Sequence, residues 1–311
     1  MDTLVIEGLG VKYVNQGAVI HAVNNVSFVI SKNESLGIVG ESGCGKSTLG
    51  LSIIRAHQGQ TSTSGKIIFN GKSILDMPAK DFTENTRWKE ISMIFQGAMN
   101  SLDPVFTIKQ QFVEILKKHK FKGDIRQTIE HVLSQVDLSE SVLDRYPHEL
   151  SGGMKQRVVI AMALLLKPNL VIADEPTTAL DVLVQAQIIN VLKELKKQGL
   201  AIILISHDMG IISEIAEKIA IMYAGEIVEF GNLDEIYRNP KHPYTIALLN
   251  STPKLKTESK VTVLEGAPPS MINLPEGCKF YDRCPHAMDK CRKNPPKTST
   301  KSGYVSCWLY E

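Results

Sequence analysis

The apolar residues of this chain fall into short uninterrupted runs and into stretches with helical spacing. Runs at 35–39, 170–173 and 201–205 are each bounded by turn-forming or polar residues, as expected of strands buried on both faces of a parallel sheet. Between the last two runs, a helix is predicted over 182–198, and Gly199 is placed to end it. Its apolar positions are Leu183, Ile188, Ile189, Leu192 and Leu195. Strand, helix and strand in this order predict an α/β class with a doubly wound core.

Other segments depart from this alternation. Residues 66–74 and 220–230 each have the pattern of two strands joined by a tight turn, so we expect antiparallel pairs at a sheet edge or in a side sheet. Residues 101–157 have helical periodicity and few strand signals. We therefore predict a first domain over residues 1–235 with a helical subdomain inserted at about 98–158. Most prolines and four of the five cysteines follow Pro240, which predicts a small irregular C-terminal module over 236–311.

Composition and charge narrow the function classes. The formal net charge of +2 gives no long-range electrostatic reason to expect nucleic acid as a partner. No apolar run approaches the roughly 20 residues that cross a bilayer, and the first residues lack the pattern of a secretory signal. We therefore expect a cytoplasmic protein that reaches a membrane only through partners.

A glycine-rich segment between a predicted strand and a predicted helix has the pattern of a phosphate-binding P-loop. Successive backbone N–H groups of such a loop, with the dipole of the following helix, form a nest for phosphate oxygens. Lys46 would reach the β- and γ-phosphates, and the Ser47 hydroxyl would ligate Mg²⁺. The predicted nucleotide-binding residues are Gly40, Glu41, Ser42, Gly43, Cys44, Gly45, Lys46, Ser47 and Thr48.

Polar residues follow two further strands. The run at 170–173 ends in Asp174 and Glu175, which are expected at the edge of the sheet where ligands of such folds bind. Asp174 would hold Mg²⁺ through water, and Glu175 would polarise the attacking water as general base. His207 follows the run at 201–205 and could contact the γ-phosphate or the water, although a histidine at a strand end can also be structural.

With these motifs on one chain, the sequence resembles the ABC ATPases over its first three quarters. The decisive segment is Leu150-Ser151-Gly152-Gly153-Met154, which is similar to the family signature LSGGQ with Met154 in the last position. The resemblance implies a P-loop (RecA-like) core with an antiparallel β side sheet. It also implies that Ser151, Gly152 and Gly153 cap the γ-phosphate of ATP bound to a second subunit, as a helix N-terminus can.

Other roles are carried over by the same resemblance. Tyr13 resembles the aromatic residue that stacks on adenine, or it is an edge-strand tyrosine. Gln96 resembles the glutamine that contacts Mg²⁺ and water. Asp181 ends a segment similar to the loop through which two ATPase domains sense each other. With Lys46, Glu175 and His207 present, the family pattern implies a site competent for hydrolysis of ATP.

The end of the chain narrows the resemblance to the oligopeptide and dipeptide importers. The segment at 239–249 is similar to the tail of that branch. Cys278, Cys284, Cys291 and Cys307 are separated by five, six and fifteen residues, which is not the paired spacing of zinc ribbons. The resemblance ranks a [4Fe–4S] cluster above Zn²⁺, and disulfides or free thiols remain as alternatives.

These patterns together predict an ATP-hydrolysing subunit that powers import of oligopeptides or dipeptides at the cytoplasmic face of the cell membrane. Its expected partners are a second ATPase subunit of different sequence, two transmembrane permease subunits and an extracytoplasmic solute-binding protein. The segment after Gln96, at 99–106, is expected to transmit closure to the permease. An oligosaccharide or nickel importer is the alternative within the family. A soluble ABC ATPase acting on DNA or ribosomes is the alternative from another class.

Overall fold

The protein is described here by a computed structural model that covers residues 2–15, 17–251 and 266–311. The chain divides into two compact units. The first comprises Met1–Asp76 and Ile205–Glu311, and the second comprises Met77–Leu204. Each unit contains part of the predicted site.

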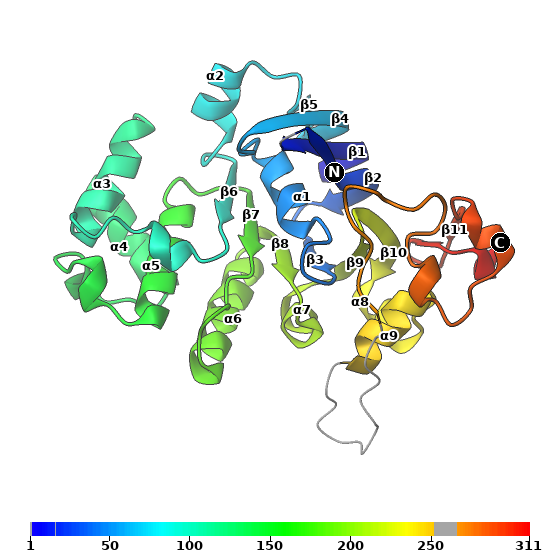
Figure 1. The fold of residues 1–311 in the computed structure, drawn as a ribbon. Helices are drawn as coiled ribbons and strands as arrows, with labels where there is room; N and C mark the ends of the chain where they lie inside the picture. Colours follow the sequence, from blue (N-terminus) through cyan, green and yellow to red (C-terminus); the bar gives the residue numbers. More distant parts are fainter. Residues whose placement is uncertain (1, 16, 252–265) are drawn as a thin grey trace. The chain divides into compact units, whose positions relative to one another are not determined.

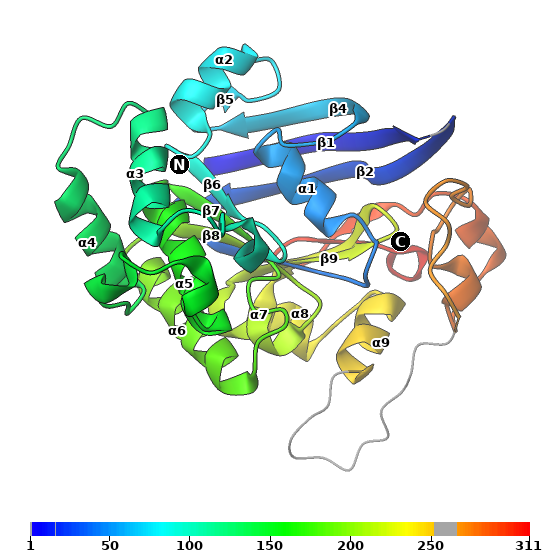
Figure 2. The same ribbon diagram turned by 60° about the vertical axis from the view of Figure 1, so that its left-hand side comes forward.

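The first unit contains an antiparallel sheet in the strand order β2-β1-β4-β5. Its strands are β1 (Asp2–Asn15), β2 (Ala18–Ser31), β4 (Gln60–Phe69) and β5 (Lys72–Ser73). Figure 2 shows β1, β2 and β4 side by side. Asn70 and Gly71 both have positive φ between β4 and β5, the geometry of a tight hairpin turn. The predicted turn and the antiparallel side sheet are therefore confirmed.

A second group of strands in this unit follows the order β11-β12-β10-β9-β3. The strands are β3 (Ser35–Val39), β9 (Lys218–Tyr223), β10 (Glu226–Asn232), β11 (Lys297–Ser299) and β12 (Tyr304–Ser306). β3 pairs parallel with β9, and the remaining neighbours pair antiparallel. The Phe28 ring of β2 stacks on Phe230 of β10, which stacks on Tyr304 of β12. The last strands of the chain thus extend the sheet that holds β3.

Helices of the first unit follow these strands. They are α1 (Lys46–Ile53), α7 (Met209–Ile215), α8 (Leu233–Arg238) and α9 (Pro243–Ser251), with short helical turns at Tyr281–Arg283, Asp289–Arg292 and Trp308–Tyr310 (Figure 1). α7 packs tightly on β3, since a Cβ at Gly37 would lie 2.3 Å from the Ile212 side chain. β3 itself is buried at every position.

The second unit contains strands in the order β8-β7-β6, and β6 pairs parallel with β7. These strands are β6 (Ile91–Ile94), β7 (Leu170–Asp174) and β8 (Ala201–Ser206), the last of which ends two residues past the unit boundary. The helices are α2 (Ala79–Asp81), α3 (Ile108–Lys118), α4 (Ile125–Gln135), α5 (Gly152–Leu164) and α6 (Val182–Lys197). Short helical turns lie at Phe82–Thr86, Ala98–Ser101, Glu140–Val142 and Pro147–Glu149. α3, α4 and α5 lie together in both views (Figures 1 and 2).

Local sequence explains where these helices begin and end. Thr107 and Gln110 form a reciprocal capping box at α3, and the Asp124 side chain caps α4. The buried face of α6 consists of Ile188, Ile189, Val191, Leu192 and Leu195. The predicted helix is therefore confirmed at four of its five apolar positions, whereas Leu183, in its first turn, is 78% exposed. None of the described helices is long and apolar enough to cross a membrane.

Candidate functional site

The glycine-rich segment predicted to bind phosphate connects β3 to α1 in the first unit. A Cβ at Gly40 would lie 2.1 Å from the Met222 carbonyl oxygen, and one at Gly45 would lie 2.1 Å from that of Ala22. Gly45 also has a φ of 104°, in the region that favours glycine. The loop is therefore packed against neighbouring backbone at two points where a side chain would not fit.

Lys46 is buried at the start of α1. Its ammonium group donates to the carbonyl oxygens of Gly40, at 2.8 Å, and Glu41, at 2.9 Å. Cys44 is buried beside it, and burial raises the pKa of that thiol. The lysine thus lies folded back over its own loop, with its charge among the carbonyl groups of that loop.

Glu41 of the same loop is held by residues from the last quarter of the chain. Its N–H group donates to the Tyr244 hydroxyl, at 2.9 Å, and its carboxylate accepts two hydrogen bonds from Arg283. Tyr244 lies in the segment at 239–249 that is similar to the peptide-importer tail, but neither Tyr244 nor Arg283 was predicted to contact the phosphate loop. No local pattern relates residues that are 203 and 242 positions away from Glu41.

Tyr13 lies on β1 in the same unit, and its hydroxyl is 3.0 Å from His57 Nδ1. The other ring nitrogen of His57 is 3.1 Å from the Ser52 hydroxyl, which donates to the Thr48 carbonyl oxygen of α1. The tyrosine is therefore connected by side chains to the helix that follows the phosphate loop. Its adenine-stacking role stays a prediction.

The predicted carboxylate pair lies in the second unit, where Asp174 ends β7 and is 3% exposed. Glu175 has a φ of 46°, a conformation that costs a non-glycine residue free energy and is common at active sites. Its carboxylate accepts hydrogen bonds from the Gln96 side chain, at 2.8 Å, and from the Thr178 hydroxyl, at 3.0 Å. The structure therefore brings together Gln96 and Glu175, two of the predicted catalytic residues.

The remaining predicted catalytic residue, His207, is exposed just after β8, in the first unit. The following residue, Asp208, caps α7 by accepting a hydrogen bond from the Gly210 N–H group. The catalytic role of His207 stays a prediction.

The predicted signature segment begins α5 in the second unit. The Ser151 side chain caps this helix and accepts a hydrogen bond from the Met154 N–H group. A Cβ at Gly153 would lie 2.6 Å from Val184 of α6, and one at Gly152 would lie 3.5 Å from Leu180. Asp181 caps α6 through the Val184 N–H group. The signature segment and the predicted sensing loop thus lie side by side within the second unit.

The four C-terminal cysteines line one small cavity of about 10 Å³, together with His242, Phe280 and Trp308. All four are free thiols. Burial raises the pKa of Cys284 and Cys307, and that of Cys278 to about 11. Among residues 2–15, 17–251 and 266–311, no His, Cys, Asp or Glu side chains form a group that could hold a metal ion. The geometry therefore gives no support to the predicted iron–sulfur or zinc centre.

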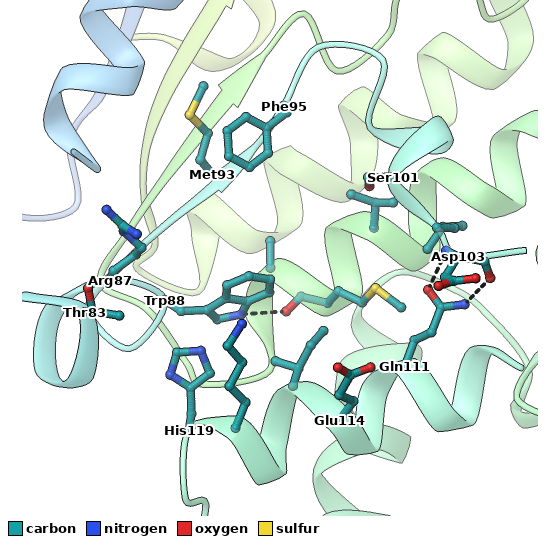
Figure 3. A pocket seen from close by; sticks show the side chains of 16 residues that line it. Thr83, Arg87, Trp88, Met93, Phe95, Ser101, Asp103, Gln111, Glu114 and His119 are labelled. Atoms are coloured by element: carbon teal, nitrogen blue, oxygen red, sulfur yellow. Dashed lines mark hydrogen bonds between the residues drawn. The ribbon is translucent and has the colours of Figure 1, made fainter. Parts of the chain in front are cut away.

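A groove of about 510 Å³ opens in the second unit between β6, α3 and α5 (Figure 3). The Trp88 indole N–H donates to the Met162 carbonyl oxygen at its base, and the Trp88 ring lies 5.7 Å from His119. Gln111 donates to the Asp103 carbonyl oxygen at one end. The remaining lining residues include apolar side chains such as Met93 and Phe95, together with Arg87, Glu114 and Lys118. The segment at 99–106, predicted to transmit closure to the permease, supplies Ser101, Leu102 and Asp103 to the lining, but the groove itself was not predicted.

Comparison with known proteins places the chain among transport ATPases. Residues 23–178 match the family model "ABC transporter", and residues 228–291 match "Oligopeptide/dipeptide transporter, C-terminal region". The oligopeptide transport ATP-binding protein AppD of Bacillus subtilis is 45% identical over 100% of this chain and 98% of its own length. OppD of Salmonella typhimurium is 43% identical over 96% of this chain and 91% of its own length.

A solved structure supports the same fold. The dimeric ATP-binding cassette MJ0796, bound to ADP and Pi, matches with a TM-score of 0.65 and 26% identity over 74% of this chain and 98% of its own. The two family matches and the full-length relatives agree with one another. The chain belongs to the ATP-binding proteins of ABC transporters, in the family that carries the oligopeptide/dipeptide transporter C-terminal region.

Proposed function

We propose that this chain hydrolyses ATP to power import of oligopeptides or dipeptides. The observation that carries the proposal is the presence of the cassette and the peptide-transporter C-terminal region on one chain that matches oligopeptide transport ATP-binding proteins over its whole length. As a peripheral subunit, it would act at the cytoplasmic face of the membrane.

Each group of the site has a proposed role. Backbone N–H groups of the phosphate loop and Lys46 hold the ATP phosphates, and Ser47 ligates Mg²⁺. Lys46 must turn from the Gly40 and Glu41 carbonyl groups to reach the nucleotide. Asp174 holds Mg²⁺ through water, and Gln96 contacts Mg²⁺ and the water. Glu175 polarises the attacking water, which is supported by the Gln96 and Thr178 hydrogen bonds that orient its carboxylate.

The signature segment serves a second ATPase subunit. Ser151, Gly152 and Gly153 are exposed or half-buried at the beginning of α5, where N–H groups and the helix dipole favour an anion. Val182 and Leu183, just after Asp181, are 79% and 78% exposed. These exposed apolar side chains favour a partner surface at this end of α6. We propose an ATPase partner of different sequence.

The groove of the second unit is the proposed permease contact. Its lining combines apolar side chains with charged ones, which suits a short amphipathic helix from a transmembrane subunit. Phe95, which lines the groove and directly precedes Gln96, is 44% exposed. A permease segment seated here would be linked through Gln96 to Glu175. An extracytoplasmic binding protein would deliver the solute to the permease.

A metal centre at the four cysteines is a separate proposal. It is argued from the resemblance to the peptide importers and from the four thiols that line one cavity, whereas the described residues form no group that could hold a metal ion. A [4Fe–4S] cluster ranks before Zn²⁺. Anaerobic purification followed by iron, sulfide and zinc analysis tests it. Metal-free protein that keeps its fold would contradict it.

The test of the proposed function is ATPase activity of the complex reconstituted with its permease and binding protein. Oligopeptides and dipeptides should stimulate hydrolysis, whereas oligosaccharides and nickel should not. Stimulation by an oligosaccharide or nickel alone would replace peptide as the substrate class. Stimulation by DNA or ribosomes without the permease would overturn the transport role.

A further inference from the structure

The phosphate loop is contacted at one residue, Glu41, by two side chains from the C-terminal part of the chain. Arg283 donates from Nη1 to Glu41 Oε2, at 2.9 Å, and from Nη2 to Oε1, at 3.0 Å. This parallel pair of charge-assisted bonds fixes the direction of the carboxylate. The Tyr244 hydroxyl accepts the Glu41 backbone N–H at 2.9 Å. Glu41 is thus held by both its side chain and its backbone.

The two partners of Glu41 are themselves fixed in place. Tyr244 is completely buried, with its ring centroid 4.7 Å from that of Tyr223 and 5.5 Å from that of Phe280. The Arg283 side chain is 6% exposed and also donates to the Tyr223 hydroxyl at 3.2 Å. Neither side chain needs to lose much further rotamer freedom in order to hold the loop.

Glu41 is also contacted by Lys46. The Glu41 carbonyl oxygen accepts from Lys46 Nζ at 2.9 Å, next to the Gly40 carbonyl at 2.8 Å. Gly40 in turn lies against the Met222 backbone. The first two residues of the loop are therefore fixed, and the Cys44 N–H closes the turn by donating to the Glu41 carbonyl oxygen at 3.3 Å.

We propose that Arg283 is a positioning residue for nucleotide binding, which acts through Glu41 and is assisted by Tyr244. In this arrangement the C-terminal part of the chain keeps the phosphate loop preorganised, so that ATP binding does not have to order it. The inference rests on the proposed binding of ATP by this loop. It adds a function for the C-terminal region inside the ATPase subunit itself.

Arg283→Gln in the full-length chain tests this inference by titration calorimetry with MgATP. We expect binding of MgATP to weaken about tenfold, as for loss of a hydrogen-bonded ion pair that is largely shielded from water. In the reconstituted complex, KM for ATP should rise by a similar factor while kcat at saturating ATP stays within about twofold. Lys218→Gln is the matched control, because it removes another partly buried ion pair of this unit, with Glu34 at 2.9 Å.

A double-mutant cycle separates positioning from a general loss of stability. Glu41→Gln should weaken ATP binding as Arg283→Gln does, and the double variant should bind no more weakly than either single variant. Equal affinity of Arg283→Gln and wild type, or additive losses in the cycle, would overturn the inference. Failure of the wild-type chain to bind MgATP would instead contradict the proposed function, and the inference with it.

Two milder variants keep the test available if Arg283→Gln does not fold. Arg283→Lys keeps the charge but loses the paired geometry, and Tyr244→Phe removes the hydroxyl that accepts the Glu41 N–H. Each should raise the dissociation constant for MgATP several-fold at unchanged Tm. Unchanged affinity in both variants would overturn the inference.

Discussion

At the scale of single residues, an unfavourable backbone conformation occurs at Glu175, the proposed general base. Glu175 has a φ of 46°, and such a backbone conformation persists only when the surrounding contacts hold it. The hydrogen bonds from Gln96 and Thr178 to its carboxylate are contacts of this kind. The preceding residue, Asp174, is held at the buried end of β7. Asp174 is thus held by the end of the strand, and Glu175 is held separately by side-chain hydrogen bonds at a left-handed backbone position.

The pH dependence of stability tests the burial of His57. Burial lowers the pKa of His57 below its ordinary value, so the folded chain takes up its proton at a lower pH than the unfolded chain does. The contribution of His57 to the free energy of unfolding should therefore fall as pH drops below about 6.5, by at most about 1.4 kcal/mol per pH unit, until the folded imidazole also titrates. Denaturant unfolding between pH 7.5 and about 5 measures it.

A variant isolates this contribution. His57→Gln should reduce the wild-type slope in that range, and the remaining slope is expected from His242 and His119, because burial lowers the pKa of both imidazoles as well. Loss of the exposed imidazole in His131→Gln should leave the wild-type slope as it is. A slope that His57→Gln does not reduce would contradict the lowered pKa of His57.

At the scale of elements, caps and close contacts determine where the signature helix and α6 begin. The Asp181 side chain accepts the Val184 N–H at 2.9 Å. Asp181→Ala should lower the free energy of unfolding by about 1 kcal/mol, because an N-cap acceptor is lost. Asp181→Asn keeps a capping oxygen and should recover most of this loss. Urea unfolding of the three proteins checks both, and equal stability of the alanine variant and wild type would contradict the capping role.

The contact between α5 and α6 gives a second prediction. A Cβ at Gly153 would lie 2.6 Å from Val184 Cγ1, so Gly153→Ala should destabilise the chain by about 1–3 kcal/mol through overpacking. Val184→Ala removes the opposing methyl groups and should restore much of the stability in the double variant. Additive losses, measured as the shift in denaturant midpoint, would locate the cost elsewhere.

Many of the helices and strands could be predicted from the sequence, since they depend on local patterns of apolar and polar residues. Apolar runs predicted β3, β7 and β8, and helical spacing predicted α6 together with its end near Gly199. The first two strands, β1 and β2, were not predicted beyond Tyr13. The groove was missed because α3, β6 and α5 are brought together by packing, and the contacts of Glu41 were missed because they join distant segments. Helix caps and hairpin turns depend on residues close together in the sequence, whereas the groove and the contacts of Glu41 form only when the whole chain is folded.

At the scale of the whole molecule, the chain is an ATP-binding protein of an ABC transporter, and its exposed apolar surfaces are the candidate contacts for partner subunits. The groove lined by Trp88 and Ile115 is proposed for the permease. Ile115→Asp places a charge in its half-buried wall, and should weaken association with the permease at least tenfold by making desolvation costly. ATP binding by the isolated subunit should stay unchanged.

Co-purification with the permease subunits, together with nucleotide titration of the free chain, measures the two effects. Val14→Asp is the control, because it adds the same charge at a 39% exposed position on β1. Full assembly of the Ile115→Asp variant would contradict the proposed docking site.

ATP-driven peptide uptake into proteoliposomes that carry the whole transporter tests whether hydrolysis of ATP by this chain drives peptide import. Wild-type complex should accumulate labelled oligopeptide or dipeptide. The Glu175→Gln complex should bind ATP as tightly, yet hydrolyse it and transport peptide at least about 100-fold more slowly, as expected for loss of a general base. Wild-type rates of uptake in the Glu175→Gln complex, or ATP hydrolysis by the wild-type complex that moves no peptide, would contradict this coupling of hydrolysis to peptide import.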